Sequence, residues 1–320
     1  MINNSSSQYI LEEYGGQMKQ AYLVLAHHQF GLLKKQIALL DDDRNDIFIH
    51  IDKKSRNVDF NDIKSVAKSS NVYFTERIAV SWGGFSMVCA ELILLESALN
   101  HGNYSYYHLL SGVDLPLKTT DEIFSFFEEN YGTEFVHFCS DDIALNKNCN
   151  LLNRIALYYP FQESHRSLFI KMLSSLCKHI QLALGTNRVY HTDKVFGYGS
   201  QWFSITDKLA EYVIKNKNYI FEFFKCSCCS DELFLQSLIL NSDFKNRLAQ
   251  KDLNQEGSTA FKRLIDWKRG SPYVFRMGDY DLLMSSDCFF ARKFDENVDP
   301  IIIDAIYHTL LNKKGHWENE

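Results

Sequence analysis

Hydrophobic and polar positions follow two alternating patterns over the first 130 residues. Runs of β-forming residues, each ending in polar residues, occur at 20–28, 46–52, 71–76 and 104–112. Segments whose apolar residues recur at helical spacing occur at 30–40, 87–100 and 121–130. The order strand, helix, strand predicts parallel βαβ units. We therefore expect an α/β fold whose mainly parallel, twisted sheet is flanked by helices, and Thr119 or Thr120 is the expected cap of the last helix.

The pattern is less regular after residue 140. We interpret residues 140–200 as an insertion over the sheet, with an amphipathic helix at 167–184. A strand and a helix follow within 197–214, and a helix at 231–240 has Ser230 as its expected N-cap. The last pattern, at 279–294, predicts a helix followed by a turn that carries Lys and Arg.

Composition and charge exclude several classes of protein. Hydrophobic residues make up 46% of the chain and charged residues 23%, which is a globular composition. The net charge is −6 and no long basic run occurs, so we expect no nucleic-acid partner. The apolar runs are too short to cross a bilayer, and residues 1–17 are polar and Ser-rich, so we expect a loose, disordered extension there. Eight scattered cysteines without a secretory signal are typical of a reducing compartment.

The stretch CSCCSDE, residues 226–232, offers either a metal site or a carboxylate site. Zinc would need a second pair of ligands at comparable spacing, and no CxxC or HxxxH lies nearby. Cys228 and Cys229 are adjacent, so we expect their thiols to point apart. The acidic pair Asp231 and Glu232 is therefore the better candidate for chemistry.

Further candidate residues follow the predicted strands, where open parallel sheets bind ligands. They are His27, His28, Asp52, Lys53, Trp82, Gly83, Gly84, Ser111, Gly112 and Asp114. No GxGxxG or Walker loop is present, so neither a dinucleotide site nor a P-loop is indicated. Asp52 either accepts hydrogen bonds from a nucleoside or is a solvated carboxylate at a strand end. The WGG stretch is either part of a site or a tight turn with a packed Trp82.

Several ordered strings resemble one known family. They are IHIDKKS, VSWGGFSMVCAELILLESAL, YYHLLSGVDLPLKTTDEIFSFF, GYGSQWFSITDKLAEYVI, SDELFLQSLILNS and FFARKFD. Together they resemble the core-2/I-branching glycosyltransferases (family 14), which also include the peptide O-xylosyltransferases, from about Met18 to about Asp299. The resemblance implies a GT-A-type nucleotide-sugar fold and inverting transfer from a UDP-sugar to a hydroxyl, without a divalent metal. We expect one domain over 18–320, with a nucleotide-binding half at 18–138 and an acceptor-side and diphosphate-binding half at 139–320.

The resemblance also implies roles for individual residues. Glu232 matches the catalytic base, in a Ser-Asp-Glu that replaces the family's usual Pro-Asp-Glu. Lys293 and Arg269 match the cations that bind the donor diphosphate, with Lys268 as the substitute for Arg269. The full expected donor set is Ala26, His27, Asp52, Ser111, Gly112, Arg269 and Lys293. The expected acceptor or pocket set is Trp82, Gly83, Asp114, Trp202 and Asp231.

Elementary chemistry agrees with these roles. A departing UDP gains negative charge, and without a metal Lys, Arg and backbone N–H groups must stabilise it. The attacking hydroxyl must lose a proton, for which an ordinary ionised glutamate suffices. At the first turn of a helix, Glu232 would also be stabilised by the helix N-terminus. The plain alternatives are a surface Lys293, a solvated Arg269 and acidic residues that only begin a helix.

Other functions stay open at the level of sequence. A metal-dependent enzyme would use an Asp-x-Asp after a strand. Of the acidic stretches at 41–43, 140–142 and 279–281, only Asp141-Asp142 follows a predicted strand, EFVHF at 134–138. A non-catalytic carbohydrate-binding protein is the alternative from another class. We favour N-acetylglucosamine as the transferred sugar, with xylose as the alternative. We expect a bacterial relative in the cytoplasm, or peripheral at the inner face of the membrane, that acts on a glycan or lipid-linked saccharide of surface-polysaccharide synthesis.

Overall fold

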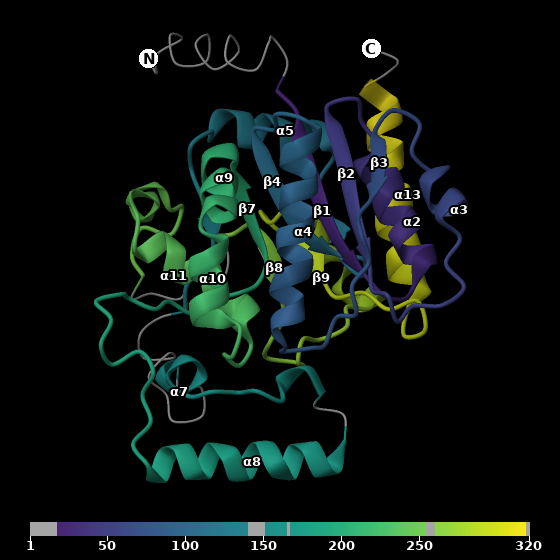
Figure 1. Ribbon diagram of the computed structural model, residues 1–320. Helices are drawn as coiled ribbons and strands as arrows, with labels where there is room; N and C mark the ends of the chain where they lie inside the picture. The colour runs from purple at the N-terminus through teal and green to yellow at the C-terminus, as the bar shows by residue number, and fades with distance from the viewer. Residues whose placement is uncertain (1–17, 140–150, 165–166, 254–259, 318–320) are drawn as a thin grey trace.

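A six-stranded sheet lies at the centre of the protein (Figure 1). The computed structural model describes residues 18–139, 151–164, 167–253 and 260–317. The strands, in sheet order, are β3 (Asn71–Phe74), β2 (Asn45–Ile51), β1 (Gln20–Ala26), β4 (Tyr106–Ser111), β7 (Phe203–Thr206) and β6 (Phe135–Val136). The first four are parallel, and β7 is antiparallel to both β4 and β6. The predicted mainly parallel α/β fold is confirmed.

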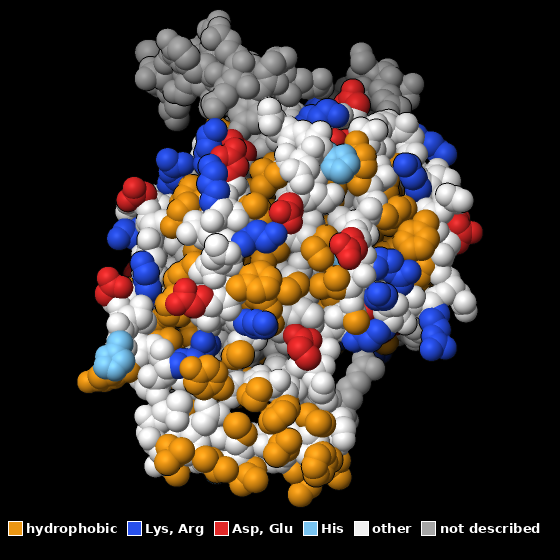
Figure 2. All heavy atoms as spheres, in the orientation of Figure 1, with side chains coloured by type: hydrophobic (Ala, Val, Ile, Leu, Met, Phe, Trp, Pro, Cys, Tyr) orange, Lys and Arg blue, Asp and Glu red, His pale blue; other side chains and the backbone are white. Residues whose placement is uncertain are grey.

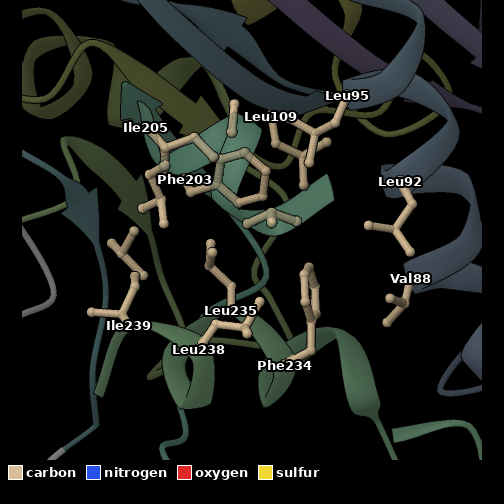
Figure 3. Close-up of a cluster of buried hydrophobic side chains, with 14 of the residues drawn as sticks. Val88, Leu92, Leu95, Leu109, Phe203, Ile205, Phe234, Leu235, Leu238 and Ile239 are labelled. Atoms are coloured by element: carbon tan, nitrogen blue, oxygen red, sulfur yellow. The ribbon is translucent and has the colours of Figure 1, made fainter. Parts of the chain in front are cut away.

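Helices cover both faces of this sheet, so side chains of one strand alternate between two cores. Ala21 and Leu23 of β1 pack in one core with α4 (Phe85–His101), whereas Tyr22 and Val24 pack in the other with α2 (Phe30–Leu40). Figure 3 shows the first core, where Val88, Leu92 and Leu95 of α4 approach β4, β7 and α11 (Phe234–Leu240). Apart from those of the insertion, the remaining described helices are α3 (Phe60–Lys64), α5 (Thr120–Glu129), α9 (Asp207–Lys215), α10 (Lys217–Phe224), α12 (Tyr280–Met284) and α13 (Pro300–Trp317), with short 3-10 turns η2 (Ser230–Glu232), η3 (Asp243–Arg247) and η4 (Met277–Asp279).

A second, three-stranded sheet holds the later part of the chain against the first. Its order is β5 (Leu115–Pro116), β9 (Phe290–Arg292) and β8 (Arg263–Ile265). Buried Arg263 joins the two sheets, because its guanidinium donates to the carbonyl of Phe203 (2.6 Å) and to the hydroxyl of Ser204 (3.1 Å). Residues 290–292 were expected in a turn, and that prediction was wrong. A strand of three residues is too short to show a periodic pattern.

The predicted insertion contains α7 (Leu151–Ala156), η1 (Gln162–Ser164) and α8 (Leu168–Ala183). The amphipathic helix predicted at 167–184 is thus confirmed. Its expected place over the sheet was wrong, because α8 runs along one end of the molecule, away from the sheet (Figure 1). The chain leaves the insertion near Val189, which joins the first core.

Of the two helix caps predicted from the sequence, one is found in the structure and the other is not. Thr119 caps α5 through a reciprocal capping box with Glu122, so Thr119 rather than Thr120 is the cap. The prediction for Ser230 was wrong, because residues 230–232 form the separate turn η2 and α11 begins only at Phe234. Leu233, with φ −124° and ψ −43°, interrupts the helical path between them. Residues 227–231, with the sequence SCCSD, have no pattern from which this break could be predicted.

Candidate active site

The side chain of Glu232 is held by Arg154, which comes from α7 of the insertion. The guanidinium Nη1 of Arg154 donates to Oε2 of Glu232 at 2.7 Å, and the two side chains are 22% and 30% exposed. Arg154 also lies 4.8 Å from the centre of the Tyr198 ring. Burial lowers the pKa of Arg154, but the nearby Glu232 carboxylate outweighs burial and raises it overall. Oε1 of Glu232 accepts no hydrogen bond from any residue that the structure describes.

Backbone hydrogen bonds fix the loop that carries Glu232. The amide of Cys229 donates to the carbonyl of Gly83 (3.0 Å), and the amide of Gly199 donates to the carbonyl of Glu232 (3.0 Å). Gly83 has a φ of +71°, which favours glycine, and it places the exposed Trp82 on the same loop. The WGG stretch is therefore a tight turn that also supports the loop of the expected base, but the expected packing of Trp82 was wrong, because its side chain is 84% exposed. Glu232 lies in η2 rather than in the first turn of an α-helix, so the expected stabilisation by a helix N-terminus was wrong.

Asp231 is turned into the protein, behind Glu232. It is 6% exposed and its Oδ1 has no hydrogen-bond partner among the described residues. Burial and the charge of Glu232 raise the pKa of Asp231 to about 8. Buried Glu91 of α4 is the next carboxyl group, and its Oε1 accepts from the amide of Gln201 at 2.7 Å. The assignment of Asp231 to an acceptor pocket stays a prediction, and its burial makes it a support for the Glu232 loop.

A buried ion pair joins the loop after β4 to the end of β9. Asp114 accepts the amide of Ser111 (2.9 Å) and lies 3.4 Å from Nη1 of Arg292. The Arg292 guanidinium stacks 4.0 Å from the centre of the Trp202 ring. Burial raises the pKa of Asp114, and Arg292 opposes that rise. The expected residues Ser111, Asp114 and Trp202 thus lie together, and the amide of Phe294, which donates to Val113 (3.0 Å), places Lys293 beside them.

The two expected phosphate-binding cations lie on neighbouring segments but differ in their surroundings. Arg269 donates to Asp266 (2.5 Å) and Asp279 (2.6 Å) and stacks on Tyr273. The backbone of Lys293 bonds to the same Tyr273, because its amide donates to that carbonyl at 3.4 Å. The Lys293 ammonium group has no hydrogen bond or ion pair with any residue in the described ranges. Lys293 is therefore the more available of the two.

The expected nucleoside side is formed by the ends of β1, β2 and β4. The amide of Asp52 donates to Ala26 (2.9 Å), and a Cβ on Gly112 would lie 2.9 Å from the Cβ of Ala26. This close approach explains why a glycine occupies position 112. Burial lowers the pKa of His27, and His28, whose ring stacks on it at 4.0 Å, lowers it further. The carboxyl ends of these strands thus lie at one edge of the sheet, as expected.

Two findings were not accessible from the sequence. Arg154 was missed because it is one basic residue in the irregular, apolar stretch LLNRIALYY, where nothing marks it. Arg292 was missed because the family resemblance pointed to its neighbour, Lys293.

The thiols of Cys228 and Cys229 were expected to point apart, and this was wrong, because they lie 3.8 Å from each other. Cys229 takes a left-handed backbone conformation, with φ 50°, that turns its side chain back.

The acidic stretches considered as metal motifs have other partners where they are described. Asp41 accepts three backbone amides, from Lys68, Ser69 and Ser70. Asp279 pairs with Arg269, and Asp141-Asp142 lies outside the described residues. Within the described ranges, no three His, Cys, Asp or Glu residues are grouped closely enough to hold a metal ion. The expectation of a metal-free reaction stays a prediction.

These features define an α/β protein with a candidate ligand site at the carboxyl edge of a mainly parallel sheet, where a partly exposed carboxylate lies together with a lysine that has no partner among the described residues. The family model described as Core-2/I-Branching enzyme matches residues 20–282, and the chain belongs to this family. The resemblance inferred from the sequence is thereby confirmed.

Named relatives add detail to this membership. The chain is 23% identical over 330 residues to xylosyltransferase 2 of Canis lupus familiaris, covering 95% of this chain and 36% of that protein. It is 23% identical over 296 residues to xylosyltransferase 1 of Homo sapiens, covering 85% and 29%. The chain thus spans about a third of the length of these curated relatives. A solved structure, mouse xyloside xylosyltransferase 1 in its apo form, is similar at 10% identity and a TM-score of 0.35, over 85% of this chain and 97% of that one. A likeness at that level adds nothing to the fold described above.

Proposed function

We propose that the chain is an inverting, metal-independent glycosyltransferase of GT-A type, which moves a sugar from a UDP-sugar to a hydroxyl of a glycan acceptor. The observation that carries the proposal is the partly exposed Glu232 carboxylate, one oxygen of which is bonded to Arg154 at 2.7 Å while the other accepts no hydrogen bond from a described residue. A fixed and partly exposed carboxylate of this kind suits a general base. Membership in the Core-2/I-Branching enzyme family supports the reaction class.

The proposed reaction is a single displacement. The acceptor hydroxyl oxygen bonds to the anomeric carbon as its proton passes to Oε1 of Glu232, and the bond from that carbon to the β-phosphate oxygen breaks. The electron pair leaves with UDP, whose growing charge is stabilised by Lys293 and Arg269. Attack opposite to the leaving group inverts the anomeric configuration.

The proposal also names the transferred sugar, the class of acceptor and the location of the protein. N-acetylglucosamine is our first candidate for the sugar, and UDP-xylose is the second because the named relatives are xylosyltransferases. The acceptor is a glycan or lipid-linked saccharide in bacterial surface-polysaccharide synthesis. The proposed location is the cytoplasm, peripheral at the inner face of the membrane. Among the described residues, no helix has both the length and the apolar character needed to cross a bilayer.

Replacing Glu232 tests the proposed base. UDP release is measured from UDP-N-acetylglucosamine and UDP-xylose with a panel of saccharide acceptors. Glu232→Gln is expected to lower kcat by roughly 100-fold to 10,000-fold, the usual contribution of a general base, while calorimetry shows unchanged UDP affinity. Glu128→Gln, a change at an exposed position of α5, is the matched control. Turnover of the Glu232 variant close to that of the wild type would refute the assignment.

A further inference from the structure

Helix α8 exposes its apolar side chains. Five of them are between 50% and 75% exposed, namely Leu168, Phe169, Met172, Leu176 and Ile180. Figure 2 shows hydrophobic side chains gathered over this helix at the end of the molecule. The opposite side of the helix is anchored, because the amide group of Gln181 donates to the carbonyl of Tyr158 (2.9 Å) and its oxygen accepts the Tyr158 amide (2.8 Å). The outward side is thus a fixed apolar surface.

Helical geometry places the exposed side chains on one side and the cations on its flank. At about 100° per residue, the five apolar side chains fall within an arc of roughly 120°. Lys171 and Lys178 fall together beside that arc, and both are exposed. An apolar arc with lysines at its border is the pattern of a helix that lies in the plane of a membrane interface.

The charge of this part of the chain contrasts with that of the whole. Residues 164–192 contain four Lys or Arg and no Asp or Glu, whereas the chain has a net charge of −6. A cationic segment in an acidic protein is complementary to a surface of opposite sign. Anionic lipid headgroups supply such a surface, and each nearby Lys or Arg contributes about 1 kcal/mol of attraction.

We propose that α8 is a docking helix that binds the surface of an anionic lipid bilayer, with its apolar arc in the interface and Lys171 and Lys178 at the headgroups. A second copy fits less well, because a symmetric contact through this face joins the same residues of both copies and so offers the lysines no acidic partner. A helix of 16 residues also has a footprint of only about 240 Å², well under the roughly 800 Å² that each partner buries in a standard interface.

The docking helix is connected to the candidate active site. Arg154, which bonds to Glu232, belongs to the same insertion, and its carbonyl accepts the amide of Cys228 at 3.0 Å. Bilayer binding through α8 would therefore place the insertion that holds Glu232 through Arg154 at the lipid surface. That this arrangement brings the site to a lipid-linked acceptor is an inference that rests on the proposed function. The inference that α8 binds a bilayer is independent of the proposed function.

Vesicle sedimentation tests the proposal with the full chain and without any donor. The vesicles contain phosphatidylcholine alone or with 30% phosphatidylglycerol. The wild type is expected to bind the mixed vesicles. Phe169→Gln, Met172→Gln and Leu176→Gln together are expected to weaken partitioning by about 100-fold or more, because three apolar side chains no longer enter the interface. Lys171→Gln with Lys178→Gln is expected to weaken it by about 30-fold.

Matched controls place the same changes elsewhere. Leu282→Gln with Ile301→Gln alters two exposed apolar residues, and Lys64→Gln with Lys245→Gln alters two exposed cations, so both should bind within twofold of the wild type. Absence of wild-type binding, or full binding by the triple variant, would overturn the proposal. So would a dimer in light scattering that the triple variant abolishes. Failure of sugar transfer with normal vesicle binding would instead count against the proposed function alone.

Discussion

At the scale of single residues, Lys293 and Arg269 differ in what already neutralises their charge. Arg269 is bound by the carboxylates of Asp266 and Asp279, and part of its attraction for a phosphate is thereby cancelled. Lys293 has no such partner within the described residues and adjoins the ion pair of Asp114 and Arg292. The lysine should therefore contribute more to binding a diphosphate.

Calorimetric titration with UDP tests this ranking. Lys293→Ala is expected to weaken UDP affinity by roughly 30-fold, about 2 kcal/mol for one charge-assisted contact. Arg269→Ala is expected to have a smaller effect, and Lys64→Ala, at an exposed position, none. An unchanged affinity in the Lys293 variant would remove this residue from the donor site.

Glu134, beside β6, is a buried carboxyl group whose protonation should set part of the pH dependence of stability. Burial raises the pKa of Glu134 to about 7 from an ordinary 4.5, although hydrogen bonds from Thr206 oppose the rise. Between these two values the folded protein holds a proton that the unfolded chain has lost. The contribution of protonated Glu134 to the stability of the folded protein is therefore fully present below about pH 4.5, and it is lost as the pH rises through 7.

Urea unfolding at several pH values measures this contribution. The free energy of unfolding of the wild type should fall from pH 5 to pH 7, with Glu134 contributing about 1.4 kcal/mol per pH unit. Glu134→Gln should reduce the slope by that amount, because the amide does not titrate. The exposed Glu128→Gln should leave the slope as in the wild type. Equal slopes in all three proteins would contradict the assignment.

At the scale of elements, the break at Leu233 divides residues 230–240 into the short turn η2, which carries the expected base, and the helix α11, which packs in the core. Residues 230–232 carry the expected base, whereas α11 places Phe234, Leu235 and Leu238 in the core shown in Figure 3. The sequence alone predicted a single helix here, because the apolar spacing of the helix does not reveal where its first turn begins. By contrast, β1, β2 and β4 were predictable because buried parallel strands leave long apolar runs.

Truncation of a core side chain should act on stability. Leu235 is 2% exposed, so Leu235→Ala is expected to lower the free energy of unfolding by about 2 to 4 kcal/mol. Leu282, 53% exposed on α12, provides the control, and Leu282→Ala should cost less than about 0.5 kcal/mol. Urea unfolding compares both with the wild type. Similar losses in the two variants would mean that α11 is not packed as described.

At the scale of the whole molecule, the sequence predicted the mainly parallel sheet and the common edge at which the candidate site residues follow its strands. Residues after strands, such as Asp52 and Asp114, could be placed because parallel strands end at a common edge. Arg154 and Arg292 could not, since their positions depend on how the insertion and the second sheet fold back. Contacts between segments distant in sequence leave no periodic signal.

Chelation tests the proposed chemistry of the whole enzyme. In the proposed reaction, cationic side chains replace a metal ion, so transfer measured as UDP release should be unchanged in excess EDTA. Added Mg²⁺ or Mn²⁺ should restore nothing, because nothing was lost. Activity that falls with EDTA and returns with Mn²⁺ would exclude the metal-free mechanism and would direct attention to Asp141 and Asp142.

The reversed direction of β7 has a practical consequence. Because β6 runs with β4 and β7 runs against both, the chain leaves β6 and enters β7 at the same edge of the sheet. A segment grafted between Val136 and Phe203 would start and finish beside the loop that carries Glu232 without changing the order of the strands. Exchange of this cassette between homologues offers a route to chimeric enzymes with altered selectivity on a preserved scaffold.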